Sequence, residues 1–174
     1  MLINLSDVFQ EQGKELCCRT KVELEQICFM GMEYKILRKT DADWTITNLE
    51  PGKARIRGTA SVVFNAPCDR CLKEVEVVME LHTERFVLSP EKPQEDDEVD
   101  DLSFMDGYNL DTETLLYNEM IENWPAKILC KEDCLGLCTV CGKNLNEGDC
   151  GCDRFVPDPR MAAIKDVFNA CKEV

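Results

Sequence analysis

Apolar and polar residues alternate along much of the first half of the chain. Residues 54–65 (ARIRGTASVVFN) place five apolar residues on one face, namely Ala54, Ile56, Ala60, Val62 and Phe64. Residues 74–84 repeat the pattern, with Val75, Val77, Met79 and Leu81 on one face and mainly acidic residues on the other. A period of two with one apolar face is typical of half-buried antiparallel strands.

Shorter segments extend this strand-rich region. Residues 21–27 (KVELEQI) and 43–49 (DWTITNL) also indicate strands, and the proline and glycine of NLEPGKA indicate a turn after the second of them. We therefore predict a twisted antiparallel β-sheet or small barrel over residues 20–88.

Two helices are predicted in the second half. Asp111 is a favourable N-cap for residues 112–124 (TETLLYNEMIENW), and Pro125 ends that helix. Asp158 followed by Pro159 is a second helix start. The segment that follows spaces its apolar residues as a helical stripe, which indicates core packing: Met161, Ile164, Phe168 and Cys171.

The net charge of −14 is concentrated in the middle of the chain. Residues 89–125 hold 12 of the 34 acidic residues and one of the 20 basic residues. The run 89–101 (SPEKPQEDDEVDD) combines prolines with acids and lacks aromatic residues, which favours a solvated loop or linker. An acidic arm that holds a basic partner or shields an RNA-binding face is the alternative, and the near-neutral flanking parts do not exclude a polyanionic partner.

Twelve cysteines are the most unusual feature of the composition. Residues 1–13 have neither the basic nor the apolar region of a signal peptide, and no apolar run has the length of a membrane span. We therefore expect a cytoplasmic protein with no membrane partner. In a reducing compartment, clustered cysteines bind metal more often than they form disulfides.

The segment 134–152 (CLGLCTVCGKNLNEGDCGC) has the spacing of a metal site. Cys138 and Cys141, followed by Gly142, form a zinc-knuckle motif, and Gly151 lets Cys150 and Cys152 turn toward one ion. We predict a four-cysteine zinc site drawn from these cysteines, with Cys134 as a substitute for a member of the last pair. Zinc is favoured over iron for four thiolates, and a fully thiolate set leaves no open position, so the metal is structural.

A second pair, Cys68 and Cys71, lies between the two longest predicted strands. Together with Cys130 and the other clustered cysteines, these residues would suffice for a second four-cysteine site. A structural turn or a redox pair are the alternatives, although a thioredoxin-like pair belongs where a strand leads into a helix.

These elements predict an α+β fold, in which a twisted antiparallel sheet or small barrel precedes two helices flanking a cysteine-rich zinc-knuckle segment. The predicted division is an antiparallel β domain (1–88), an acidic linker or loop (89–110), and a region (111–174) whose helix, zinc-binding segment and C-terminal helix pack on the sheet.

The order of these features resembles the YceD family, the large ribosomal RNA subunit accumulation proteins. The resemblance rests on CDRCL at a strand boundary, the acidic middle, the string GLCTVCGKNLN and the later DPR. It implies a non-catalytic ribosome-biogenesis factor that supports accumulation or processing of large-subunit (23S) ribosomal RNA. The implied partners are ribosomal RNA or the pre-50S particle, or a basic ribosomal protein.

Residues for RNA contact can be named from the charge pattern. Lys53, Arg55 and Arg57 share one strand face and Arg70 lies at a predicted hairpin tip, where guanidinium groups can contact phosphates and stack on bases. The same residues could instead pair across strands with glutamates.

An enzyme is not expected, because His82, the sole histidine, has no nucleophile near it in sequence. No small-molecule substrate is expected either. Two alternative functions remain open: a zinc-ribbon module that binds transcription machinery or DNA, and a thiol-redox or zinc-release sensor.

Overall fold

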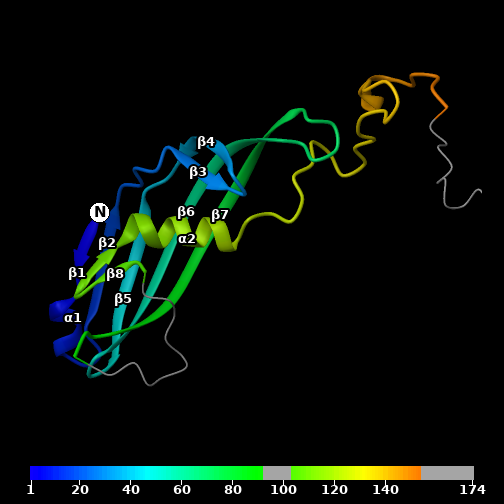
Figure 1. The fold of residues 1–174 in the computed structure, drawn as a ribbon. Coiled ribbons are helices and arrows are strands. Elements are labelled where there is room, and N and C mark those ends of the chain that lie inside the picture. Colours follow the sequence, from blue (N-terminus) through cyan, green and yellow to red (C-terminus); the bar gives the residue numbers. More distant parts are fainter. Residues whose placement is uncertain (92–102, 154–174) are drawn as a thin grey trace, which may run out of the picture. The chain divides into compact units, whose positions relative to one another are not determined.

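The structure is a computed structural model that describes residues 1–91 and 103–153 (Figure 1). Within these ranges the chain forms nine strands, two α-helices and one 3-10 helix. The strands are β1 (Leu2–Asn4), β2 (Glu15–Thr20), β3 (Gln26–Phe29), β4 (Met32–Lys39), β5 (Ala42–Glu50), β6 (Lys53–Pro67), β7 (Glu74–Leu88), β8 (Met105–Asp106) and β9 (Asn109–Asp111). The helices are α1 (Ser6–Gln10), α2 (Thr112–Glu122) and the 3-10 helix Leu145–Glu147.

The predicted antiparallel region forms a six-stranded sheet built around β6. Strand β7 pairs with β6 along its whole length, from Lys53 opposite Leu88 to Pro67 opposite Glu74. On the other edge of β6, β5 pairs with its first half and β4 with its second half. Strands β2 and β3 extend this sheet beyond β5 and β4, and β1, β9 and β8 form a second, three-stranded sheet.

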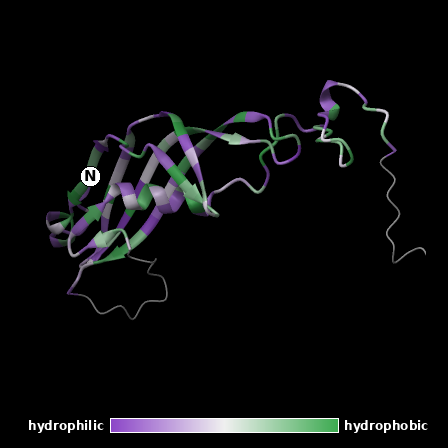
Figure 2. Cartoon of the chain, turned by 45° about the horizontal axis from the view of Figure 1, so that its top comes forward, coloured by the Kyte–Doolittle hydropathy of each residue, from purple (hydrophilic) through white to green (hydrophobic). Residues whose placement is uncertain are grey.

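Alternation along the strands explains the sheet's buried face. The apolar residues predicted to face inward from β6 are all buried, as are Met79 and Leu81 on β7. Val75 and Val77, closer to the hairpin tip, are half-buried. Hydrophobic and hydrophilic residues alternate along these strands in Figure 2.

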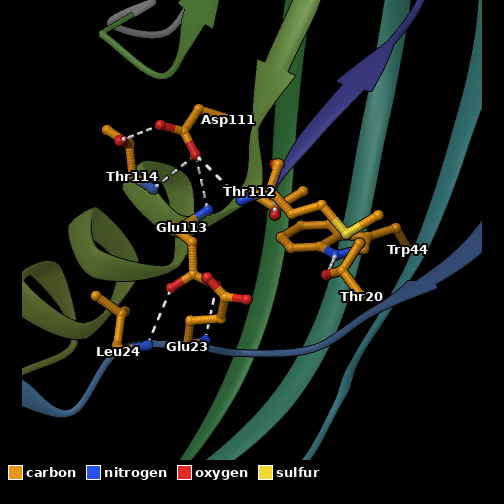
Figure 3. Close-up of polar contacts among 9 residues, drawn as sticks. Thr20, Glu23, Leu24, Trp44, Asp111, Thr112, Glu113 and Thr114 are labelled. Atoms are coloured by element: carbon orange, nitrogen blue, oxygen red, sulfur yellow. Dashed lines mark hydrogen bonds and ion pairs between the residues drawn. The ribbon is translucent and has the colours of Figure 1, made fainter.

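Helix α2 packs on this face, and two side chains fix its start. Asp111 accepts hydrogen bonds from the backbone N–H groups of Glu113 and Thr114, as predicted for an N-cap. The Glu113 carboxylate accepts the N–H groups of Glu23 and Leu24, at 2.9 and 3.2 Å, and so holds the β2–β3 connection (Figure 3). The buried residues of α2, Leu115, Leu116 and Met120, belong to the hydrophobic core of the sheet.

An aromatic group lies just beyond the end of α2. The Trp124 ring stacks on Phe29 and on Phe64, with centroids 4.5 and 4.9 Å apart, and lies 4.7 Å from Tyr34. These contacts join β3, β4 and β6 to the chain that leaves the helix.

The described chain divides into two compact units. The first comprises Met1–Pro67 and Glu74–Ile128 and holds both sheets; the second comprises the hairpin tip Cys68–Lys73 and the chain from Leu129 onward. The predicted boundaries at residues 88 and 110 stay a prediction, because residues 92–102 lie outside the described ranges.

The predicted α+β fold class is wrong, because the described structure is mostly β-sheet. Within residues 1–91 and 103–153, α2 is the one helix longer than five residues, so two helices do not flank the cysteine-rich segment there. The second predicted helix, 159–171, lies outside the described residues. Strand pairing explains the difference, because segments too short or too mixed to show alternation still form strands when they meet a partner: β2 pairs with the longer β5, and β9 pairs with β1 and β8.

Candidate metal centres

The β6–β7 hairpin ends in a tight turn that carries Cys68 and Cys71. The Cys68 N–H donates to the Lys73 carbonyl at 2.8 Å, and the Leu72 N–H donates back to the Cys68 carbonyl at 2.9 Å. These two bonds reverse the chain within six residues. Leu72 has a φ of +59°, a left-handed conformation that a residue with a Cβ rarely adopts.

The segment Cys138–Lys143 forms the same turn from a different sequence. The Cys138 N–H donates to the Lys143 carbonyl and the Gly142 N–H donates to the Cys138 carbonyl, both at 2.8 Å. Gly142 has a φ of +74° at the position that Leu72 occupies in the first turn. The two turns are therefore equivalent knuckles, each presenting two sulfurs three residues apart.

Four cysteines gather at the first knuckle, and we call them cluster I: Cys68, Cys71, Cys130 and Cys134. Their sulfur atoms all lie within 4.8 Å of one another. The Cys71 and Cys130 sulfurs are 3.5 Å apart, and those of Cys68 and Cys134 are 3.8 Å apart. Sulfurs bound to one zinc ion at about 2.3 Å would be separated by roughly 3.8 Å. The spacing therefore fits a tetrahedral thiolate site.

The second knuckle gathers cluster II: Cys138, Cys141, Cys150 and Cys152. These sulfurs also lie within 4.8 Å of one another. Gly151, with a φ of +68°, supplies the bend between the last two cysteines. Cluster II is the more accessible of the two, because Cys141 is exposed, whereas Cys68, Cys71 and Cys134 of cluster I are all buried.

Each cluster contains a sulfur whose pKa is lowered to about 6, and the pKa of Cys134 in cluster I is lowered as well. Burial opposes ionisation of Cys68, but hydrogen bonds from the backbone of Arg70, Cys130 and Cys71 lower its pKa to about 6. In cluster II, the backbone N–H groups of Cys141 and Val140 lower the pKa of Cys138 to about 6.

A different sulfur in each cluster resists ionisation. Burial, together with the neighbouring Cys71 and Cys134 sulfurs, raises the pKa of Cys130 to about 12. The Cys141 and Cys150 sulfurs raise the pKa of Cys152 to about 12. Four thiolates at this spacing repel one another, so a cation that binds all four would relieve the repulsion, and the donor set of both clusters fits such an ion.

The structure places each predicted ligand in one of these clusters. Cys138, Cys141, Cys150 and Cys152 come together, whereas Cys134 lies with Cys68, Cys71 and Cys130. The sulfurs of Cys17, Cys18 and Cys28 belong to neither cluster.

A family model described as "Large ribosomal RNA subunit accumulation protein YceD" matches residues 56–168. The chain belongs to the YceD family. Both clusters lie within the matched range. Membership of the YceD family implies a role in accumulation of the large ribosomal RNA subunit. Searches of curated proteins and of solved structures gave no match.

The basic residues predicted to contact RNA fall into two groups in this YceD protein. Lys53, Arg55 and Arg57 lie on β6, and the Arg57 guanidinium pairs with Glu84 on β7 at 3.0 Å. Arg70 lies in the first knuckle, where its guanidinium donates to the Cys134 carbonyl at 2.8 Å. Arg70 therefore makes a contact inside the cysteine-rich unit.

One residue that shapes cluster I was not predicted as a site residue. The Asn146 side-chain amide donates to the Cys134 sulfur at 3.3 Å. Its signal in the sequence is the string NLN at residues 144–146. None of the helices in the described ranges has the length and hydrophobicity needed to cross a membrane.

Proposed function

We propose that this YceD protein is a non-catalytic ribosome-biogenesis factor that supports accumulation or processing of 23S ribosomal RNA. In this proposal clusters I and II each hold a structural zinc ion. The observation that carries the proposal is the pair of equivalent knuckles, each closing a four-sulfur group inside the family-matched range.

Zinc is the metal that the donor set favours. Four thiolates in a tetrahedral arrangement suit zinc, which has no geometric preference of its own and no redox chemistry. With four protein ligands the ion has no site for a substrate or an activated water, so its role is to hold the fold. Within the described part of the second compact unit, the ordered structure is limited to turns, one 3-10 helix and one isolated β-bridge. Bound metal would supply the stability that such a small unit lacks.

Direct contact with ribosomal RNA is proposed for the outer face of β6. Arg55 and Arg57 lie on the same face, and Glu84 is an ion-pair partner of both, at 3.9 and 3.0 Å. An exposed ion pair contributes about 0–1 kcal/mol, so an RNA phosphate can replace Glu84 as the partner at little cost. Such contacts bind the RNA backbone and do not read its sequence.

Metal content tests the zinc part of the proposal. Purified, reduced protein is expected to contain two zinc ions per chain by elemental analysis. Cys68→Ser and Cys138→Ser are each expected to lower the content to about one. Cys28→Ser, an exposed cysteine outside both clusters, is the matched control and should retain two. Metal-free protein that remains folded would refute the structural role.

The ribosomal part is tested in cells of the source organism that lack the protein. The ratio of large-subunit to small-subunit ribosomal RNA should fall, and the tagged protein should co-sediment with pre-50S particles. Wild type and Cys28→Ser should restore the ratio, whereas Cys68→Ser should not. A normal ratio in the deletion strain, or association with RNA polymerase in place of pre-ribosomes, would contradict this assignment.

The RNA contact has its own variant. Arg55→Gln combined with Arg57→Gln should weaken binding to ribosomal RNA fragments uniformly across sequences and make binding less dependent on salt. Arg19→Gln, an exposed arginine paired with Asp43 on the same sheet, is the matched control. Unchanged affinity and salt dependence in the double variant would place the contact elsewhere.

A further inference from the structure

The segment between the two halves of cluster II has a defined shape. It runs from Asn144 through the 3-10 helix Leu145–Glu147, and we call it the NLNE loop. The Asn144 side-chain oxygen accepts hydrogen bonds from the backbone N–H of Asn146 at 3.0 Å and from its side-chain amide at 2.9 Å. The loop lies between Cys141 and Cys150 in the sequence, so binding of one ion by cluster II would fix both of its ends.

The NLNE loop is bonded to the chain that supplies cluster I. The Asn146 amide donates to the Cys134 sulfur at 3.3 Å, and its oxygen accepts the Leu135 N–H at 3.0 Å. The Leu145 N–H donates to the Gly136 carbonyl at 2.9 Å. A β-bridge between Leu137 and Asn144 completes the contact.

The bond to Cys134 has a chemical consequence for cluster I. Cys134 is 2% exposed, so water has little access to its sulfur. A buried thiolate needs hydrogen-bond donors, and a donor amide also fixes the direction in which the sulfur offers its lone pairs. One side chain of the cluster II loop therefore both stabilises and orients a ligand of cluster I.

We propose that the NLNE loop couples the two metal sites, with Asn146 as the positioning residue for Cys134. This inference rests on the proposed binding of metal by both clusters. An ion bound in cluster II orders the NLNE loop. Cluster I then binds metal without the entropic cost of ordering that loop. By linkage, metal in cluster I raises the affinity of cluster II by the same factor.

The experiment measures the metal affinity of each cluster by cobalt titration of the full-length, reduced apoprotein. Thiolate-bound cobalt absorbs visible light, and competition with a chelator of known affinity gives the dissociation constants. The Cys141→Ser/Cys150→Ser variant reports cluster I alone, and Cys68→Ser/Cys71→Ser reports cluster II alone. Emptying cluster II is expected to weaken cluster I about tenfold or more.

The positioning role needs a variant that keeps the shape of the side chain. Asn146→Asp removes the amide donor and places a carboxylate beside the thiolate. It should weaken cluster I by about 10–100-fold. In the Cys68→Ser/Cys71→Ser background it should change cluster II less than about threefold. Asn118→Asp, on α2 in the other compact unit, is the matched control.

The outcomes separate the two proposals. Fewer than two cobalt ions bound by the wild type would refute the premise that both clusters bind metal. Two ions bound with affinities that do not depend on occupancy of the other cluster would refute the coupling and leave the proposed zinc sites standing. An equal loss at both clusters in Asn146→Asp, with each cluster measured in the variant that reports it alone, would show that Asn146 merely shapes the loop, and would overturn its positioning role.

Discussion

Replacing Gly58 by alanine should destabilise the sheet, although alanine is usually the better residue within a strand. Gly58 on β6 lies directly opposite Trp44 on β5. A Cβ atom at position 58 would lie 2.3 Å from Cζ3 and 2.5 Å from Cε3 of the indole. Ordinary carbon contacts are about 3.5 Å or longer, so the ring would have to withdraw by about 1 Å.

The surroundings of Trp44 set the size of the effect. The side chain is 1% exposed, and its indole N–H donates to the Thr20 hydroxyl at 2.9 Å (Figure 3). Overpacking a well-filled core costs about 1–3 kcal/mol. Loss of the indole hydrogen bond adds about 1 kcal/mol. Removing the flexibility of glycine from the unfolded chain returns roughly 0.5–1 kcal/mol. The net loss is about 1–3.5 kcal/mol, which corresponds to roughly 2–14 °C in Tm.

Urea unfolding followed by far-ultraviolet circular dichroism measures this loss, and a second background tests its cause. Trp44→Leu removes the indole that the new methyl group would contact. Gly58→Ala should therefore cost less than about 1 kcal/mol in the Trp44→Leu background, because the two positions are in direct contact and their effects are not additive. Equal losses in both backgrounds, or a Gly58→Ala protein as stable as the parent, would refute the steric reasoning.

Three further perturbations test other parts of the structure. Arg85→Ala removes the guanidinium that lies 2.6 Å from the buried Glu119 carboxylate, which is 3% exposed, and should cost about 3–5 kcal/mol in urea unfolding. Glu122→Ala removes the second, exposed partner of Arg85 and should cost under about 1 kcal/mol. Equal losses in the two variants would contradict this assignment. Asp111→Ala should cost about 1 kcal/mol at pH 7 through loss of the helix cap. Burial opposes ionisation of Asp111, but hydrogen bonds from Thr114 and the Glu113 backbone outweigh burial and lower the pKa of Asp111. The stabilisation is therefore present above the ordinary pKa near 4 and should shrink as the pH falls through the folded-state pKa. A stability difference between wild type and Asp111→Ala that is unchanged down to pH 2 would exclude the ionised cap. Metal release to a chelator should be biphasic, because cluster II contains the exposed Cys141 and should lose its ion first. In Cys68→Ser, which leaves cluster II, the remaining ion should be released at least as fast as in the fast phase of the wild type, and release at the slow rate alone would reverse the order.

Alternation predicted the centre of the sheet well and its margins poorly. Residues of β6 and β7 face the sides that the period of two indicated, because each strand buries one face against the core. The segment 21–27 was predicted as a strand, but β2 ends at Thr20 and β3 begins at Gln26. β2 was not predicted, since its sequence ELCCRT places cysteine on both faces and shows no clear apolar side. Its position depends on pairing with β5, which local sequence does not encode.

The composition of cluster I shows why spacing alone could not assign all the metal ligands. Cys68 and Cys71 are separated from Cys130 and Cys134 in the sequence by the whole of the hairpin strand β7 and the whole of α2. A motif search finds pairs, but the folded chain decides which pairs meet. Cys134 could therefore be considered with cluster II, which follows it directly in sequence, although its sulfur lies beside Cys68.

The two knuckles differ in the residue that follows the second cysteine, which is the residue that identifies a knuckle in a sequence. Glycine after the second cysteine marked Cys138–Lys143 as a knuckle, because its φ of +74° is easily reached without a Cβ. Leu72 occupies the same position in the first knuckle at a cost of about 1–2 kcal/mol. Four sulfurs that bind an ion can offset this cost many times over, since structural zinc contributes about 10–16 kcal/mol in zinc-finger peptides. A strained leucine in a turn that otherwise matches the glycine knuckle is therefore a reason to expect metal in cluster I. In the sequence, the same leucine made the knuckle hard to identify, because the expected glycine is missing.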